Sequence, residues 1–132
     1  MPKTVKIKEE VYCTLEVEGI HNWPECPFEE VAYLRDPHRH VFHIKAHKKV
    51  THSDRDVEFI MLKHQILNHF YDGYFNSELK LFEFGPMSCE MIAKELIVKF
   101  DLLKCEVSED GENGAIVSVT GIVTDGNHII SP

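Results

Sequence analysis

The stretch HRHVFHIK, residues 38–45, decides the expected fold and the expected site of this chain. Polar and apolar residues alternate over much of it, and alternate side chains of a β-strand share one face. His38 and His40 therefore point the same way, at a spacing that suits two ligands of one metal ion. Zn²⁺ is the expected ion, because catalytic zinc uses three protein ligands and one open position. His21 is the candidate third ligand. The alternative is a strand with two ordinary histidines, since the chain has nine histidines and close pairs arise by chance.

The composition favours a globular protein with its own core. Of the 132 residues, 43% are apolar and 27% are charged. This fits one domain spanning 1–132, with a core at about 10–121 and a tail at 122–132. The net charge of −8 disfavours nucleic acid and anionic membrane surfaces as partners, because both attract clustered Lys and Arg.

Cysteine usage and hydropathy indicate the expected compartment. The four cysteines form no C-x-x-C pair, and no signal peptide is recognised. No apolar run approaches the roughly 18 residues of a membrane span. We therefore expect a cytoplasmic protein with free thiols.

The first strand and the loop after it carry the third histidine. Residues 5–20 alternate between apolar and polar side chains, which predicts a half-buried strand. His21 has the parity of the apolar face. Prolines interrupt residues 22–37, and a loop of this length between two strands is uncommon unless it covers something.

The second strand is expected at about 38–50. Its inner face carries His38 and His40 and continues into apolar residues. Inward-facing polar groups need partners, which favours the metal hypothesis. His43 and His47 lie on the other face, and we expect them to be solvated.

Two amphipathic helices follow. Ser53, with an acidic residue three positions on, resembles a capping box and predicts the start of the first helix. Apolar residues recur at helical spacing over 59–71, and Asp72-Gly73 predicts the end of the helix. Ser88 is the expected N-cap of the second helix, whose apolar stripe covers 92–100.

The remaining segments complete the predicted order. Residues 74–85 are expected to be a linking segment. A strand at 102–108, a turn at 109–114 and a return strand at 115–123 predict a hairpin. The order β-β-α-α-β-β predicts an α+β fold, with a four-stranded antiparallel sheet and two helices packed on one face.

Five short motifs occur in order within residues 10–120. They are VEGIH at 17–21, HRH at 38–40, VEF at 57–59 with LK at 62–63, PMSCEMIA at 86–93, and VSE at 107–109 with GAIV at 114–117. Together they resemble the motifs of the 6-pyruvoyl-tetrahydropterin synthase / 6-carboxytetrahydropterin synthase family. The fold of that family is the tunnelling fold, or T-fold.

The resemblance implies a T-fold in which His21, His38 and His40 hold zinc. It implies that Glu109 grips the amino-pyrimidine edge of a pterin-like ring, and a carboxylate can accept two N–H bonds side by side. The alternative for Glu109 is an ordinary surface carboxylate beside a turn. Glu90 is a second candidate for substrate binding, with a helix N-terminal charge as its alternative. The resemblance also implies a homo-oligomer, expected to be a hexamer with its sites at subunit contacts.

The acid–base residues depart from the family pattern. The family has a cysteine a few residues before its H-G-H motif, whereas Cys26 lies twelve residues before His38 and Arg39 replaces the glycine. The family's Asp-His pair has no counterpart, and His69 is the nearest substitute. Cys26 and His69 are the candidate catalytic residues, since a general acid must reach the reacting atom.

Three functions follow as hypotheses. The first is a zinc-dependent enzyme with lyase-type chemistry on a pterin- or purine-derived small molecule similar to dihydroneopterin triphosphate. The second is a T-fold module that binds such a ligand without turnover. The third is a structural oligomer without a ligand. A cupin-type barrel is a weaker alternative, because it needs more strands and fewer helices.

Overall fold

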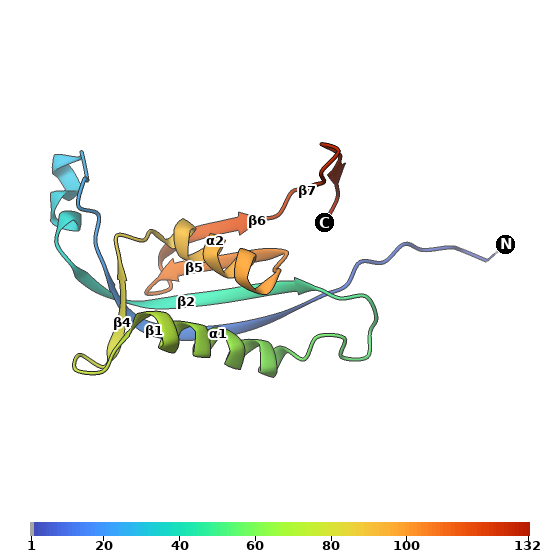
Figure 1. The fold of residues 1–132 in the computed structure, drawn as a ribbon, viewed down its shortest axis with the longest axis horizontal. Helices are drawn as coiled ribbons and strands as arrows, with labels where there is room; N and C mark the ends of the chain where they lie inside the picture. The colour runs from blue at the N-terminus through green and yellow to red at the C-terminus, as the bar shows by residue number, and fades with distance from the viewer. Residues whose placement is uncertain (1) are drawn as a thin grey trace.

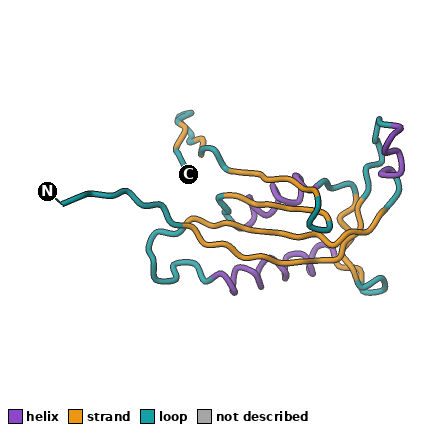
Figure 2. Tube along the Cα trace, turned by 180° about the vertical axis from the view of Figure 1, so that it is seen from behind, coloured by secondary structure: helices purple, strands orange, loops and turns teal. Residues whose placement is uncertain are grey.

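A computed structural model describes residues 2–132, and its main feature is a six-stranded mixed sheet with two α-helices on one face (Figures 1 and 2). The α+β class expected from the sequence is confirmed. The sheet strands are β1 Glu10–His21, β2 His38–Lys49, β3 Phe75–Asn76, β4 Leu81–Gly85, β5 Lys104–Glu109 and β6 Asn113–Ser118. The helices are the 3₁₀ helix η1 Glu29–Arg35, α1 Phe59–Tyr74 and α2 Cys89–Phe100.

The four-stranded antiparallel sheet predicted from the sequence is wrong in its strand count. The strand order is β3-β4-β1-β2-β5-β6, and only β1-β2-β5-β6 forms the expected antiparallel set. β4 pairs parallel to β1, and β3 pairs with β4. The predicted linking segment at 74–85 therefore supplies two strands, because Phe82 and Phe84 are buried in the core.

The core lies between the sheet and both helices. Along β1 and β2 the inward positions alternate as predicted, and their apolar side chains meet the apolar stripes of α1 and α2. The central buried side chains are Val17, Phe42, Ile44, Ile66, Phe70, Ile92, Leu96 and Val107. This parity also directs His21, His38 and His40 toward the covered side of the sheet.

A glycine lets three strands approach closely at one end of the sheet. Gly19 of β1 pairs with His40 of β2 and with Phe82 of β4. A Cβ atom at Gly19 would lie 2.6 Å from the ring of Phe84 and 3.0 Å from the ring of Phe42. Gly19 thus makes room for aromatic packing directly below the histidines.

The start of α1 differs from the prediction. Glu58, and not Ser53, caps this helix, with its side chain accepting the Met61 N–H. The side chain of Asp56 instead accepts two hydrogen bonds from Thr51, so it stabilises a turn before the helix. The capping-box pattern considers only Ser53 and Asp56, and it does not include Thr51, whose hydrogen bonds occupy the Asp56 carboxylate.

The predicted end of the first helix and the predicted start of the second had different outcomes. α1 continues past Asp72-Gly73 to Tyr74, because the chain passes directly into β3 without a left-handed glycine cap. The Ser88 cap of α2 is confirmed, and its side chain accepts the Met91 N–H. β6 ends at Ser118, and the tail forms a short hairpin of β7 Ile122–Val123 and β8 Ile129–Ile130.

The expectation that His47 is solvated is wrong. It lies on the outer face, as its parity predicted, but it is only 6% exposed. Its Nδ1 lies 3.2 Å from a carboxylate oxygen of Glu10, and its Nε2 lies 2.8 Å from one of Glu106. Tyr12 packs beside the ring. These neighbours come from β1 and β5, the two strands that pair with β2, so local alternation could not reveal the burial.

Among residues 2–132 no helix is both long and apolar enough to cross a membrane. All four cysteines are free and buried.

Candidate metal centre

Three histidines meet where β1 ends and β2 begins. The antiparallel register pairs His21 with His38 and places His40 opposite Gly19, two residues away. The centroid of the His21 ring lies 4.6 Å from that of His38 and 5.4 Å from that of His40, and the last two are 5.0 Å apart. The three residues expected to be metal ligands are therefore brought together.

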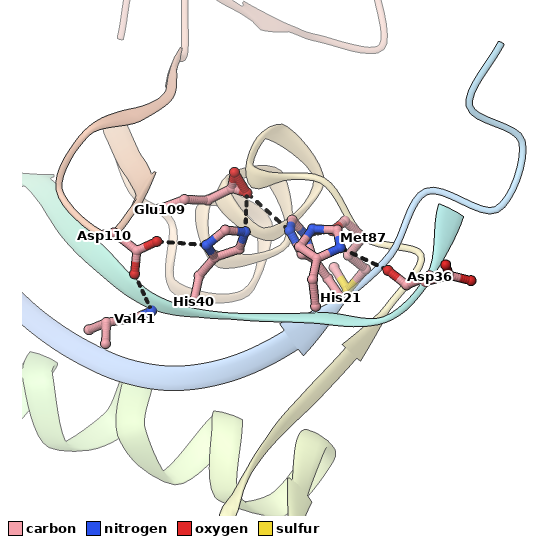
Figure 3. A network of polar contacts seen from close by, with 8 residues as sticks. His21, Asp36, His40, Val41, Met87, Glu109 and Asp110 are labelled. Carbon is pink, nitrogen blue, oxygen red and sulfur yellow. Dashed lines mark hydrogen bonds and ion pairs between the residues drawn. The ribbon is translucent and has the colours of Figure 1, made fainter. Parts of the chain in front are cut away.

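Glu109 completes the cluster from a third strand. β5 pairs with β2 so that Glu109 lies opposite Phe42, two residues from His40. Its Oε2 lies 3.0 Å from Nε2 of His21 and 3.5 Å from Nε2 of His40 (Figure 3). One ligand atom from each of the four residues lies within 4.8 Å of all the others.

The other nitrogen of each ring is held by an acceptor. His21 Nδ1 donates to the Met87 carbonyl oxygen at 2.9 Å, and His38 Nδ1 donates to the Asp36 carbonyl oxygen at 2.9 Å. A carbonyl oxygen cannot donate, so in the neutral tautomer of each ring the proton is on Nδ1 and the lone pair is on Nε2. This arrangement orients histidines in metal sites.

Asp110 plays the same role for His40. Its Oδ2 lies 2.7 Å from His40 Nδ1, and its Oδ1 accepts the Val41 N–H at 2.9 Å (Figure 3). The Val41 hydrogen bond and then the His40 hydrogen bond lower the pKa of Asp110. Asp110 therefore stays ionised at neutral pH and accepts a hydrogen bond from the Nδ1–H group of His40.

Sequence reasoning did not single out Asp110. The only local signal was its place in the Asp-Gly turn after Glu109, which is typical of hairpins. In the structure Asp110 adopts φ 58°, a left-handed conformation that Asp tolerates. The turn thereby directs its carboxylate back to β2.

A buried nitrogen tests whether these residues fit a metal ion. Among residues 2–132, His21 Nε2 is buried and has no hydrogen-bond partner. Burial lowers the pKa of His21, and His38 and His40 act in the same direction, against the raising effects of Met87 and Glu109. The ring is therefore neutral, and its lone pair faces the Glu109 oxygen at 3.0 Å. A cation between these two acceptors would relieve their repulsion.

The spacing is compatible with a metal site. Two ligands on a tetrahedral zinc ion, with bonds of about 2.0–2.2 Å, lie about 3.3–3.5 Å apart. The two distances from Glu109 to ring nitrogens, 3.0 and 3.5 Å, fall close to this range. The cluster of His21, His38, His40 and Glu109 can thus hold a metal ion.

A cavity of about 510 Å³ adjoins the cluster. The loop between β1 and β2 contributes Trp23 and Leu34, and the start of α2 contributes Cys89 and Met91. Glu90, predicted to bind substrate, also lines it, as do the cluster residues His21, His38 and Glu109. The lining of the cavity therefore combines apolar side chains with the histidine and glutamate side chains of the candidate metal centre.

The two predicted catalytic residues are not brought to the cluster. Cys26 is buried inside the loop, where its Sγ lies 3.7 Å from the carbonyl oxygens of Phe28 and Val31. His69 lies on α1, and its Nε2 is 3.0 Å from a carboxylate oxygen of Glu95 on α2. Neither lines the cavity beside the histidines.

Cys89 is the thiol that lines this cavity. Burial, followed by the charges of Glu109 and Glu90, raises the pKa of Cys89 to about 12. The thiol is therefore protonated at neutral pH and is a weak nucleophile.

A comparison with models of known protein families finds no match, and neither does a comparison with curated proteins.

Proposed function

We propose that this protein is a zinc-dependent T-fold protein similar to the 6-pyruvoyl-tetrahydropterin and 6-carboxytetrahydropterin synthases, acting on a pterin- or purine-derived small molecule. One observation carries the proposal: one nitrogen from each of the three histidines converges with a Glu109 oxygen beside the 510 Å³ cavity. The order of the five sequence motifs supports it. The β1-β2-β5-β6 antiparallel set with two helices on one face is compatible with the proposed fold.

The residues present suit zinc. Three imidazoles and a carboxylate are ligands that Zn²⁺ accepts readily. A bound zinc ion would polarise an oxygen of the ligand. His21, His38 and His40 would hold the ion, while Met87, Asp36 and Asp110 keep each ring in the required tautomer.

The walls of the cavity would orient the small molecule. Trp23 lines the cavity and is 43% exposed, so it offers an aromatic surface. Leu34 and Met87 provide apolar contacts that exclude water. Glu90 and Glu109 offer carboxylates to the N–H groups of a pterin- or purine-like ring.

A second candidate is a T-fold module that binds the ligand without turnover. The observation that favours it is the composition of the cavity wall. Cys26 and His69 lie elsewhere, and the Cys89 thiol is held protonated. A general acid or base needs a pKa near the working pH and reach to the reacting atom.

Metal analysis of purified protein tests the site. We expect about one zinc per chain after removal of loosely bound metal. His40→Ala should abolish binding, because it removes a ligand. His43→Ala is the matched control, since His43 lies on the same strand but faces Glu16 on the outer side. Full zinc retention in His40→Ala would exclude the three-histidine site.

Turnover separates the candidate functions. Consumption of dihydroneopterin triphosphate, followed by chromatography, supports the enzyme. A bound pterin- or purine-like molecule in native mass spectra, without turnover, supports the binding module. A protein with neither metal nor ligand would support the structural oligomer.

The proposed T-fold also predicts assembly. β3 and β6 are the edges of the sheet, and exposed edges favour pairing with another chain. We expect a homo-oligomer, and by resemblance a hexamer, in native mass spectrometry. A 15.3 kDa monomer would count heavily against the T-fold assignment.

A further inference from the structure

We propose that Glu109 is a displaceable fourth ligand, which closes the metal centre until a small molecule with its own donor atom enters the cavity. The inference rests on the proposed metal site and adds a gate to it. It differs from the role that the sequence resemblance implies, in which Glu109 contacts only the ring. The metal would thus be protected from water and stray anions when the cavity holds no ligand.

The position of Glu109 is that of a ligand. Its Oε2 contacts Nε2 of both His21 and His40, at distances close to those between neighbouring ligands of one ion. A group that only lined the cavity would not need to approach both nitrogens. With Glu109 bound, all four positions of a tetrahedral site are filled by the protein, which is typical of a closed site.

Two adjacent carboxylates serve the same histidine from opposite sides. Asp110 holds Nδ1 of His40, whereas Glu109 faces Nε2. Asp110 is fixed by a second hydrogen bond, from the Val41 N–H. Glu109 differs: within residues 2–132 no N–H group of the backbone or of Lys or Arg donates to its carboxylate. One carboxylate is thus anchored, and the other is held only by the cluster.

Glu109 also has room to move. Its side chain is 28% exposed, and it lines the 510 Å³ cavity together with His21 and His38. A ligand arriving through the cavity meets the carboxylate and the cluster at the same place. The exchange breaks the bond between Glu109 and the metal as the ligand's oxygen or nitrogen forms one. No electron is transferred.

The chemistry of the cavity indicates the class of ligand. One side of the cavity would present the bound metal ion, and the carboxylate of Glu109, once displaced from the ion, could accept hydrogen bonds from N–H groups of the ligand. The other walls include Trp23, Leu34 and Met91, which suit a flat or apolar body. The ligand class is therefore a small, flat molecule with a metal-binding oxygen or nitrogen and adjacent N–H groups.

Cobalt substitution and azide binding test the gate. Visible absorption of bound Co²⁺ reports the number and type of its ligands. We expect wild-type protein to bind Co²⁺ and to resist azide. In Glu109→Gln and Glu109→Ala the absorption should change. If the open form makes up about 1–10% of the wild type, azide affinity should rise about 10- to 100-fold.

The controls separate this inference from the proposed function. Glu112→Gln removes one charge from the same exposed turn and should leave the cobalt spectrum and azide affinity unchanged. Glu109→Ala guards against coordination by the glutamine oxygen. Cobalt spectra and azide affinities equal to wild type in both Glu109 variants would overturn the gate alone. Failure of wild-type protein to bind Co²⁺ or Zn²⁺ would overturn the metal site itself.

Discussion

Replacing Asp110 by asparagine tests the orientation of the metal ligands. Asp110 accepts the His40 Nδ1–H with one oxygen and the Val41 N–H with the other. An asparagine has only one acceptor oxygen. If that oxygen stays on Val41, its NH₂ group faces the Nδ1–H of His40, and two donors oppose each other. His40 would then favour the other tautomer, with a proton on the nitrogen that must bind the metal.

The magnitude follows from the role of such partners. Loss of a group that orients a metal-binding histidine costs about 10- to 100-fold in metal affinity, or about 1.4–2.7 kcal/mol. Asp110 provides both an oriented acceptor and a negative charge, so we expect Asp110→Asn to reach the upper half of this range. The effect should be smaller than that of His40→Ala, which removes the ligand.

The assay is a competition titration of zinc against a chromophoric chelator. Glu112→Gln is the matched control, because it removes one negative charge from the same turn without touching His40. A thermal shift at fixed zinc concentration provides a second measurement, since metal that binds only the folded state stabilises it. An Asp110→Asn affinity equal to that of Glu112→Gln would refute the role of Asp110.

Three further predictions concern the fold. His47→Ala should lower the free energy of unfolding by about 1–3 kcal/mol in urea titrations, because two carboxylates lose their buried partner. The His47 hydrogen bond lowers the pKa of Glu106, so the stabilisation from this pair is lost as pH falls below about 4.3 and Glu106 becomes protonated. The free energy of unfolding of His47→Ala should therefore fall less steeply with pH in this acid range than that of the wild type. An unchanged pH dependence would contradict the pairing of His47 with Glu106. Gly19→Ala should cost about 1–3 kcal/mol by overpacking, whereas Gly73→Ala, with open space around its Cβ, should gain about 0.5–1 kcal/mol. Equal changes in the free energy of unfolding in the two glycine variants would contradict the close packing of Phe84 against Gly19. Burial raises the pKa of Cys105 to about 12, so mass spectrometry should find this thiol unlabelled by a thiol reagent in the native protein at pH 8 and labelled after unfolding; rapid native labelling would contradict its burial.

Local patterns were sufficient for much of the framework. Alternation predicted that His21 lies on the apolar face of its strand, and that His38 and His40 share the inner face of theirs. Ser88 was correctly expected to cap the second helix. These features depend on neighbours a few residues apart, which is the range over which side-chain periodicity and capping act.

Tertiary structure alone decided how the site is completed. His21 is oriented by the carbonyl of Met87, 66 residues away, and His40 by Asp110, 70 residues away. The placement of β4 parallel to β1 and the burial of His47 likewise depend on packing between distant strands. The sequence by itself determined which side chains face inward along each strand. Strand pairing decided which distant groups meet them, because those contacts depend on registers that no local periodicity encodes.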